Sequence, residues 1–266
     1  MGLKLNNVNS NNLNDINIKF IENEITTIIS NNENSKIELL NILSGQENPS
    51  SGFIMYNKEK IELTTTCKKL NNYKENIYCI KDDYKNMLFN INVDEDIKYY
   101  IGSYDTESLK ELLNSFGLNI NILKKCYFEL SDSEFRKILL IIGLMSKQKI
   151  IIFNYPTLCL DNKSIQTFIK KIKKIRRENK IIIINSNNSE FLLEISNRII
   201  VINEQKIIAD GNKYDILSNN KLLKKVDMKV PNILHFINKT KELKKINMGY
   251  RDNINDLIKD IFRYAK

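Results

Sequence analysis

Short, unbroken runs of apolar or β-branched residues are the clearest pattern in the sequence. Residues 150–153 and 181–184 are wholly apolar, and β-branched side chains dominate residues 25–29 and 198–202. Runs of this length are too short to span a membrane and lack the alternation of a half-exposed strand. They therefore predict strands buried on both faces, which are typical of a parallel α/β sheet.

Other segments alternate apolar and polar positions. Residues 3–20 predict two strands around a polar turn, residues 53–63 a hairpin, and residues 78–80 a further strand. The segment 206–208 completes a hairpin with the strand at 198–202. The N-terminal part is therefore expected to form a β-subdomain beside the parallel sheet.

Apolar residues at helical spacing predict the helices. The clearest isolated helix begins at Asp105, a capping residue, and stops at Gly117. Asp161 is the predicted N-cap of a helix over residues 162–178. A further helix follows Lys36, and two amphipathic helices are predicted over residues 231–243 and 254–265.

The end of the strand at 150–153 is where chemistry is expected, because parallel sheets bind ligands at the carboxyl ends of their strands. Asn154 and Tyr155 occupy that position, and Pro156, Thr157, Leu160 and Asp161 follow. This segment resembles the Walker B and D-loop segment of ABC-type ATPases. The resemblance fails at Asn154 and Tyr155, where the family has two acidic residues.

The segment after the strand at 25–29 has the layout of a phosphate-binding P-loop, a strand followed by a loop and a helix. Compared with the family motif, Lys36 matches, whereas Ser30, Glu33 and Ser35 replace glycines and Ile37 replaces the hydroxyl residue that holds magnesium. Glu33 adds a like charge near the expected phosphates, a repulsion of up to ~4 kcal/mol at about 4 Å. Without the motif, Lys36 would be interpreted as a solvated loop lysine. The predicted nucleotide-binding-like segment comprises Ser30, Asn31, Asn32, Glu33, Asn34, Ser35, Lys36, Ile37 and Glu38.

The remaining family motifs recur in order but are altered. Lys81 replaces the Q-loop glutamine, and Asn187 replaces the switch histidine. Leu160 and Asp161 retain the D-loop pattern. The signature-like segment consists of Leu130, Ser131, Asp132, Ser133 and Glu134.

The resemblance implies an α/β, P-loop NTPase-like ABC nucleotide-binding domain with a mostly parallel central sheet, an N-terminal antiparallel β-subdomain and an inserted helical subdomain. The expected boundaries are 1–225 for this domain, with the helical subdomain at about 82–145, and 226–266 for a C-terminal helical extension. The extension resembles the dimerisation region of energy-coupling-factor (ECF) transporter ATPases. Packing of the extension against its own domain is the alternative.

The amino-acid composition adds little to these expectations about fold and function. The chain has 42% hydrophobic and 27% charged residues and a net charge of +9, which indicates either an acidic partner or a biased genome. One histidine and four scattered cysteines predict no metal site. Because no signal peptide or spanning segment is recognised, the expected location is cytoplasmic and peripheral on the inner face of the cell membrane.

Three functions remain open. The first is a catalytically silent ABC subunit, similar to ECF ATPases, that pairs with an active ATPase subunit and a transmembrane subunit. The second is a weak or atypical ATPase that uses Lys36 and Lys81 to bind phosphates. The third is a soluble regulatory or nucleic-acid-binding protein with the same fold, although nucleic acid is not an expected partner. ATP is expected to bind weakly if at all, and no magnesium site is expected.

Overall fold

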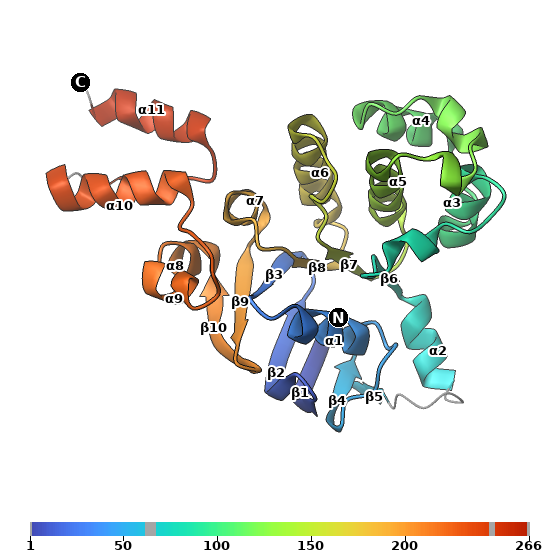
Figure 1. Ribbon diagram of the computed structural model, residues 1–266, viewed down its shortest axis with the longest axis horizontal. Coiled ribbons are helices and arrows are strands. Elements are labelled where there is room, and N and C mark those ends of the chain that lie inside the picture. Colours follow the sequence, from blue (N-terminus) through green and yellow to red (C-terminus); the bar gives the residue numbers. More distant parts are fainter. Residues whose placement is uncertain (1, 62–67, 245–247, 265–266) are drawn as a thin grey trace.

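The computed structural model describes residues 2–61, 68–244 and 248–264, which form two sheets surrounded by helices (Figure 1). The larger sheet has the order β10-β9-β3-β8-β7-β6, and its strands are parallel except for β10. This is the mostly parallel sheet that the apolar runs predict. Its strands are β3 (Glu24–Ser30), β6 (Ile77–Cys79), β7 (Ile150–Asn154), β8 (Ile181–Asn185), β9 (Arg198–Asn203) and β10 (Lys206–Asn212).

The smaller sheet is antiparallel and has the order β2-β1-β4-β5. It confirms the predicted N-terminal β-subdomain, although residues 62 and 63 of the predicted hairpin lie outside the described part of the chain. Asn57 and Lys58 turn the hairpin with positive φ angles of 52° and 70°, as tight hairpin turns require. The strands are β1 (Gly2–Ser10), β2 (Leu13–Ile21), β4 (Ser51–Tyr56) and β5 (Glu59–Ile61).

Helices cover both faces of the parallel sheet. The helices α3 to α5 and the C-terminal helices α10 and α11 lie at opposite ends of the molecule (Figure 1). None of the described helices combines the length and the apolar character needed to cross a membrane. The helices are α1 (Glu33–Leu43), α2 (Lys68–Glu75), α3 (Val93–Ile101), α4 (Thr106–Ser115), α5 (Asp132–Met145), α6 (Asn162–Ile175), α7 (Ser189–Ile195), α8 (Lys213–Leu217), α9 (Asn220–Lys224), α10 (Asn232–Lys244) and α11 (Ile254–Tyr264), with short 3₁₀ turns η1 (Tyr84–Met87), η2 (Ile120–Lys124) and η3 (Tyr127–Glu129).

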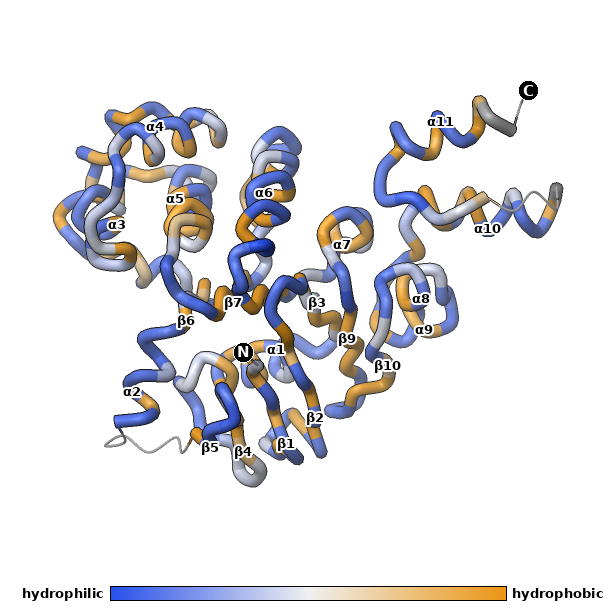
Figure 2. The backbone as a smooth tube through the Cα atoms, turned by 180° about the vertical axis from the view of Figure 1, so that it is seen from behind, coloured by the Kyte–Doolittle hydropathy of each residue, from blue (hydrophilic) through white to orange (hydrophobic). Residues whose placement is uncertain are grey.

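The strand β7 explains the continuous apolar pattern. Ile151 and Phe153 pack into the core beneath the helical layer, whereas Ile150 and Ile152 pack into the core that the antiparallel sheet shares. Successive side chains of a strand point to opposite faces, so a strand between two cores needs apolar residues at every position. Figure 2 shows this as dense orange along β7, in contrast to the mixed colours of α6.

One helix ends earlier than the sequence predicts. The helix predicted over 162–178 ends at Ile175, because the amide groups of Arg177 and Glu178 bond three residues back and Asn179 has a positive φ of 55°. Such a tightened last turn with a left-handed residue is a common helix end. At the C-terminus, Ala265 of the last predicted helix lies outside the described residues.

The C-terminal helices contact the preceding domain through apolar and polar groups, and Leu234 of α10 is buried in the core beneath the helical layer. Asp252 accepts from the Lys213 ammonium and from the Tyr214 hydroxyl, both at 2.6 Å. The backbone N–H of Asn232 donates to Glu190 at 2.7 Å. These contacts hold the start of each C-terminal helix to its own domain and leave part of each helix uncovered.

Candidate functional site

The P-loop segment (Ser30–Glu38) joins β3 to α1 at the carboxyl edge of the parallel sheet. Asn32 caps α1, and its Oδ1 accepts from the N–H groups of Asn34 at 3.0 Å and Ser35 at 3.4 Å. The sequence predicts a loop that ends at Lys36, but the helix already begins at Glu33, three residues before that point. With no glycine to favour positive φ and a strong capping residue at Asn32, the segment continues as helix.

Lys36 is fully buried, which corrects its alternative interpretation as a solvated loop lysine. Its Nζ donates to Glu33 Oε1 at 2.6 Å and contacts the Tyr155 hydroxyl. The Tyr155 hydroxyl in turn donates to both carboxylate oxygens of Glu33 at 2.6 Å. Three side chains from the P-loop segment and the end of β7 therefore form one hydrogen-bonded group, the Lys36–Glu33–Tyr155 cluster.

Burial and charge act together in this cluster. Desolvation lowers the pKa of Lys36, and the hydrogen bond and charge of Glu33 partly oppose that shift. Desolvation also raises the pKa of Tyr155 well above its ordinary range, and the hydrogen bond to Glu33 adds to the effect. Tyr155 is therefore a neutral hydrogen-bond donor near neutral pH and a poor proton acceptor.

A pair of amides marks the end of β7. Nδ2 of Asn185, at the end of β8, donates to Oδ1 of buried Asn154 at 2.6 Å. Arg136, on α5, reaches the same place: it donates to the backbone carbonyl of Asn154 and, at 2.5 Å, to that of Tyr155. The sequence identified Asn154 and Tyr155 but not these partners, which lie on other elements.

Glu38 connects the P-loop segment to the first β-hairpin. Its carboxylate accepts from the backbone N–H groups of Asn11 at 3.1 Å and Asn12 at 2.8 Å and from the Ser10 hydroxyl. Ser35 adds a hydrogen bond from its hydroxyl to the Asn12 carbonyl at 2.9 Å. Glu38 and Ser35, both in the predicted nucleotide-binding-like segment, thus bond to the turn at Asn11 and Asn12 instead of facing solvent.

The Q-loop and switch positions both follow strands of the parallel sheet. Lys81 is exposed two residues after β6, and Asn187 is exposed two residues after β8. Neither side chain is hydrogen-bonded or ion-paired to the P-loop segment within the described ranges. The structure therefore links Tyr155 to the P-loop segment. It bonds Asn154 to Asn185 instead, and it links neither Lys81 nor Asn187 to that segment.

The signature-like segment, Leu130 to Glu134, forms the start of α5. Ser131 and Glu134 make a capping box, with the Ser131 hydroxyl accepting from the Glu134 N–H at 3.2 Å. Asp132 is ion-paired with Lys85 at 2.9 Å, and Glu134 with Lys125 at 2.9 Å. The acidic groups of the segment are thus paired with lysines of the same chain.

The D-loop position Asp161 caps α6, as predicted. Its Oδ1 accepts from the Ser164 N–H at 2.8 Å, and its Oδ2 lies 3.2 Å from the Lys137 ammonium. The hydrogen bonds from Ser164, followed by the contact with Lys137, hold the pKa of Asp161 well below its usual range. Leu160 packs, partly buried, against the core of the helical layer.

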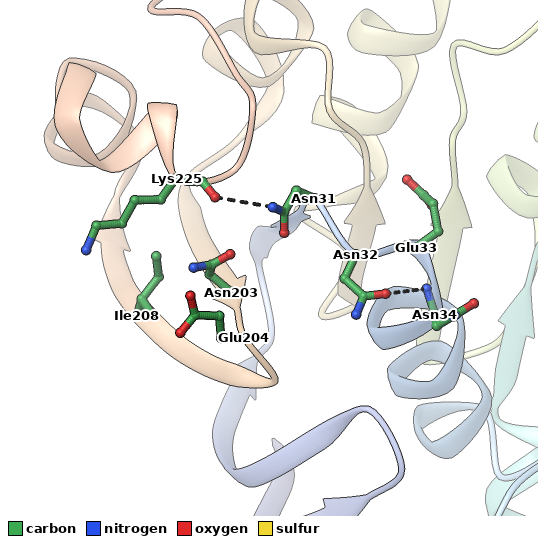
Figure 3. A pocket seen from close by; sticks show the side chains of 8 residues that line it. All are labelled: Asn31, Asn32, Glu33, Asn34, Asn203, Glu204, Ile208 and Lys225. Atoms are coloured by element: carbon green, nitrogen blue, oxygen red, sulfur yellow. Dashed lines mark hydrogen bonds between the residues drawn. The ribbon is translucent and has the colours of Figure 1, made fainter.

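An open cleft of about 770 Å³ adjoins the P-loop segment (Figure 3). It separates Asn31 to Asn34 from the hairpin of β9 and β10, and Asn31 Nδ2 donates across it to the Lys225 carbonyl at 3.4 Å. The cleft wall is lined mainly by amide and carboxylate groups. Its lining residues are Asn31, Asn32, Glu33, Asn34, Asn203, Glu204, Ile208 and Lys225.

Comparison with known proteins accounts for this arrangement of strand, P-loop segment and helix. The profile of the ABC transporter family matches residues 13–158, more than half of the chain. The ATP-binding protein EcfA2 of the energy-coupling factor transporter of Mycoplasmoides gallisepticum is 28% identical over 85% of the chain and 75% of that relative. The EcfA2 of Clostridium acetobutylicum is 26% identical over 94% of the chain and 86% of that relative.

Solved structures show the same fold. The cbiO1 of Clostridium perfringens, part of an ABC transporter complex, superposes with a TM-score of 0.67 at 22% identity, over 89% of this chain and 98% of that one. A dimeric ATP-binding cassette bound to ADP and Pi superposes with a TM-score of 0.69 at 18% identity, over 79% of this chain and 98% of that one. The fold is that of an ABC nucleotide-binding domain. The chain belongs to the ABC transporter family, as an ATPase-type subunit related to those of energy-coupling-factor transporters.

Proposed function

We propose that the chain is a catalytically silent ABC subunit that pairs with an active ATPase subunit on a transmembrane partner. The observation that carries this proposal is the end of β7, where Asn154 and Tyr155 replace two acidic residues. Asn154 is bonded to another amide, and Tyr155 is bonded to Glu33. Neither side chain supplies a carboxylate for a metal or a base for water.

Hydrolysis of ATP needs charge neutralisation at the phosphates and a group that orients or deprotonates water. Loss of a general base alone typically lowers the rate by ~10²–10⁴-fold. In this chain Ile37 also stands where the family motif has a hydroxyl residue that binds magnesium. ATP, if it binds at all, is therefore expected to bind without efficient turnover.

Magnesium-dependent hydrolysis by the purified chain tests the proposal. We expect phosphate release no faster than that of Lys36→Ala or of a buffer control. Turnover that Lys36→Ala abolishes would instead establish the weak-ATPase alternative. Isolation of the tagged chain from its native membranes tests the pairing, and recovery as a lone monomer would contradict it.

The partners are proposed from the relatives, which are named ATP-binding proteins of energy-coupling factor transporters. We propose another ABC ATPase subunit and a transmembrane subunit, and hence a peripheral position at the inner face of the membrane. The C-terminal extension, residues 226–266, is the proposed contact between ATPase subunits. Its exposed apolar side chains support this assignment.

A second candidate function, binding of nucleic acid, is favoured by the charge of α6 and of the turn that follows it. Residues 163–180 contain eight Lys and Arg residues and one acid, Glu178, so that 8 − 1 gives +7 of the total +9. Among the described residues, Lys170, Lys171 and Lys174 form no ion pair. We expect any such binding to weaken steeply with salt, as phosphate contacts require. Exchange of these three lysines for glutamine should abolish it, and RNA retention that is independent of salt would contradict this candidate.

A further inference from the structure

The Lys36–Glu33–Tyr155 cluster has the form of an occupied anion site. The Lys36 ammonium and the Tyr155 hydroxyl both direct hydrogens at one acceptor, the Glu33 carboxylate, with three contacts of 2.6 Å. Charge-assisted contacts of this length are among the stronger hydrogen bonds in proteins. The donors come from two elements, α1 and the end of β7, so the fold places them together before any ligand arrives.

Burial explains why the carboxylate remains there. The Lys36 side chain is completely inaccessible, whereas the Glu33 side chain is 54% exposed. A buried ammonium is unfavourable unless it is paired and hydrogen-bonded. Glu33 is the counter-ion of Lys36 within the part of the chain that the structure describes. The pair leaves the site with no net charge to attract an external anion.

We propose that Glu33 is a built-in occupant of an oxyanion site formed by Lys36 and Tyr155, so that it keeps phosphate groups out and its removal opens the site. This inference deepens the proposed function, on which it rests: the chain is silent, and its own carboxylate blocks phosphate entry. An entering phosphate must displace Glu33 from both donors. Because the backbone of Glu33 is fixed in the first turn of α1, the displaced carboxylate stays tethered beside the site and repels an anion of like charge.

The competing explanation is that Glu33 only favours the start of α1, since acids in a first turn are stabilising there. Glu95 provides the matched control, because it is an exposed acid in the first turn of α3. Glu33→Gln and Glu95→Gln each remove one negative charge from the first turn of a helix, at its first and its third residue. Only the first of them removes a charge from beside Lys36.

The test is equilibrium titration of the purified full-length chain with inorganic phosphate, and separately with ATP without magnesium. We expect wild type and Glu95→Gln to bind neither at millimolar concentration, and Glu33→Gln to bind both at least about tenfold more tightly. Glu33→Gly is a second variant with the same expected gain. Adding Lys36→Ala to either Glu33 variant should abolish the gain, because the cation is the proposed anchor.

Equal binding by wild type and Glu33→Gln would overturn the inference, as would an equal gain for Glu95→Gln. These outcomes are distinct from failure of the proposed function. Steady hydrolysis by wild type would contradict catalytic silence whatever the Glu33 variants bind. Phosphate binding by Glu33→Gln without hydrolysis would support both conclusions.

Discussion

Asn154 and Asn185 form a buried amide pair at the ends of adjacent strands, 2.6 Å apart. Truncation of one amide leaves the other buried without its hydrogen-bond partner. Such an unsatisfied group destabilises the folded state by roughly 1–3 kcal/mol. We expect Asn154→Ala and Asn185→Ala each to lower the free energy of unfolding by about that amount, measured by urea denaturation. The double variant should lose less than the sum, because both changes remove one shared contact. Additive losses would show that the two amides do not interact.

Tyr78, on β6, provides a prediction about pH. Its buried hydroxyl donates to the Leu139 carbonyl at 2.7 Å, and burial raises the pKa of Tyr78 well above 10.0. The folded state therefore holds this proton more tightly than the unfolded state. Its stabilising contribution is complete below pH 10.0 and is lost as the pH rises above it.

We expect Tyr78→Phe to lower the free energy of unfolding by about 1 kcal/mol at neutral pH. The difference between variant and wild type should shrink above pH 10, because the variant has no hydroxyl to ionise. Denaturation curves at neutral and alkaline pH measure this, and Tyr127→Phe, which changes a more exposed tyrosine, is the control. A difference that does not vary with pH would contradict the prediction.

At the residue scale the sequence identified positions better than contacts. Asn154 and Tyr155 are recognisable in the sequence as the residues that follow a buried strand. Tyr155 and Glu33, however, are 122 residues apart, so their hydrogen bonds depend on the fold. The three-residue spacing of Glu33 and Lys36 could have indicated the contact between them. On a helix such residues are neighbours, and the pair was mistaken for a loop.

At the scale of elements, Gly143 allows α5 to lie close to the sheet. A Cβ at this position would come within 2.7 Å of the Phe153 ring and 2.8 Å of the Tyr78 ring. Gly143→Ala should stabilise the helix by about 1 kcal/mol through its higher helix propensity. The added methyl group overpacks the core, however, which costs about 1–3 kcal/mol of stability. We expect a net loss of thermal stability. Phe153→Leu should be less destabilising in the Gly143→Ala background than in wild type, and equal losses in both would exclude this clash as the cause.

The sequence predicted elements with strong periodicity and missed short ones. The strands β7 and β8 are uniformly apolar, and α4 has both a cap at Asp105 and a stop at Gly117. By contrast, α2 and α7 are only eight and seven residues long and were not predicted. Short helices show too few turns for a period to emerge, although the cap of α7 at Asn188 could have indicated it.

At the scale of the molecule, the order of motifs predicted the fold, whereas the total net charge did not reveal where the basic residues are concentrated. The alternation of strands and helices is enough to indicate a parallel α/β sheet, and the family comparison confirms it. The net charge of +9 was interpreted only as a total, although most of it lies in residues 163–180. A local charge count would have revealed this, because it needs no structure.

The C-terminal helices present an apolar surface that their own domain leaves open. Leu257 is buried against the small core of the extension, with Ile237 and Met248. On the same helix Ile258, Ile261 and Phe262 are 42%, 39% and 70% exposed. A helix with this pattern normally buries its apolar face against another element. We propose that the face binds another ABC ATPase subunit, either a copy of this chain or a homologue.

The double variant Ile258→Asp/Ile261→Asp tests this contact by placing two charges in the proposed interface. Burial of each isoleucine is worth roughly 1.5–3 kcal/mol, so we expect the double variant to recover at least about tenfold less of a co-isolated ATPase subunit. Lys259→Gln changes an exposed residue between the two positions and should leave recovery unchanged. Equal recovery with both variants would assign subunit pairing to another surface. The extension would then be an appendage that packs on its own domain, through buried Leu234 and through the contacts of Asp252 with Lys213 and Tyr214.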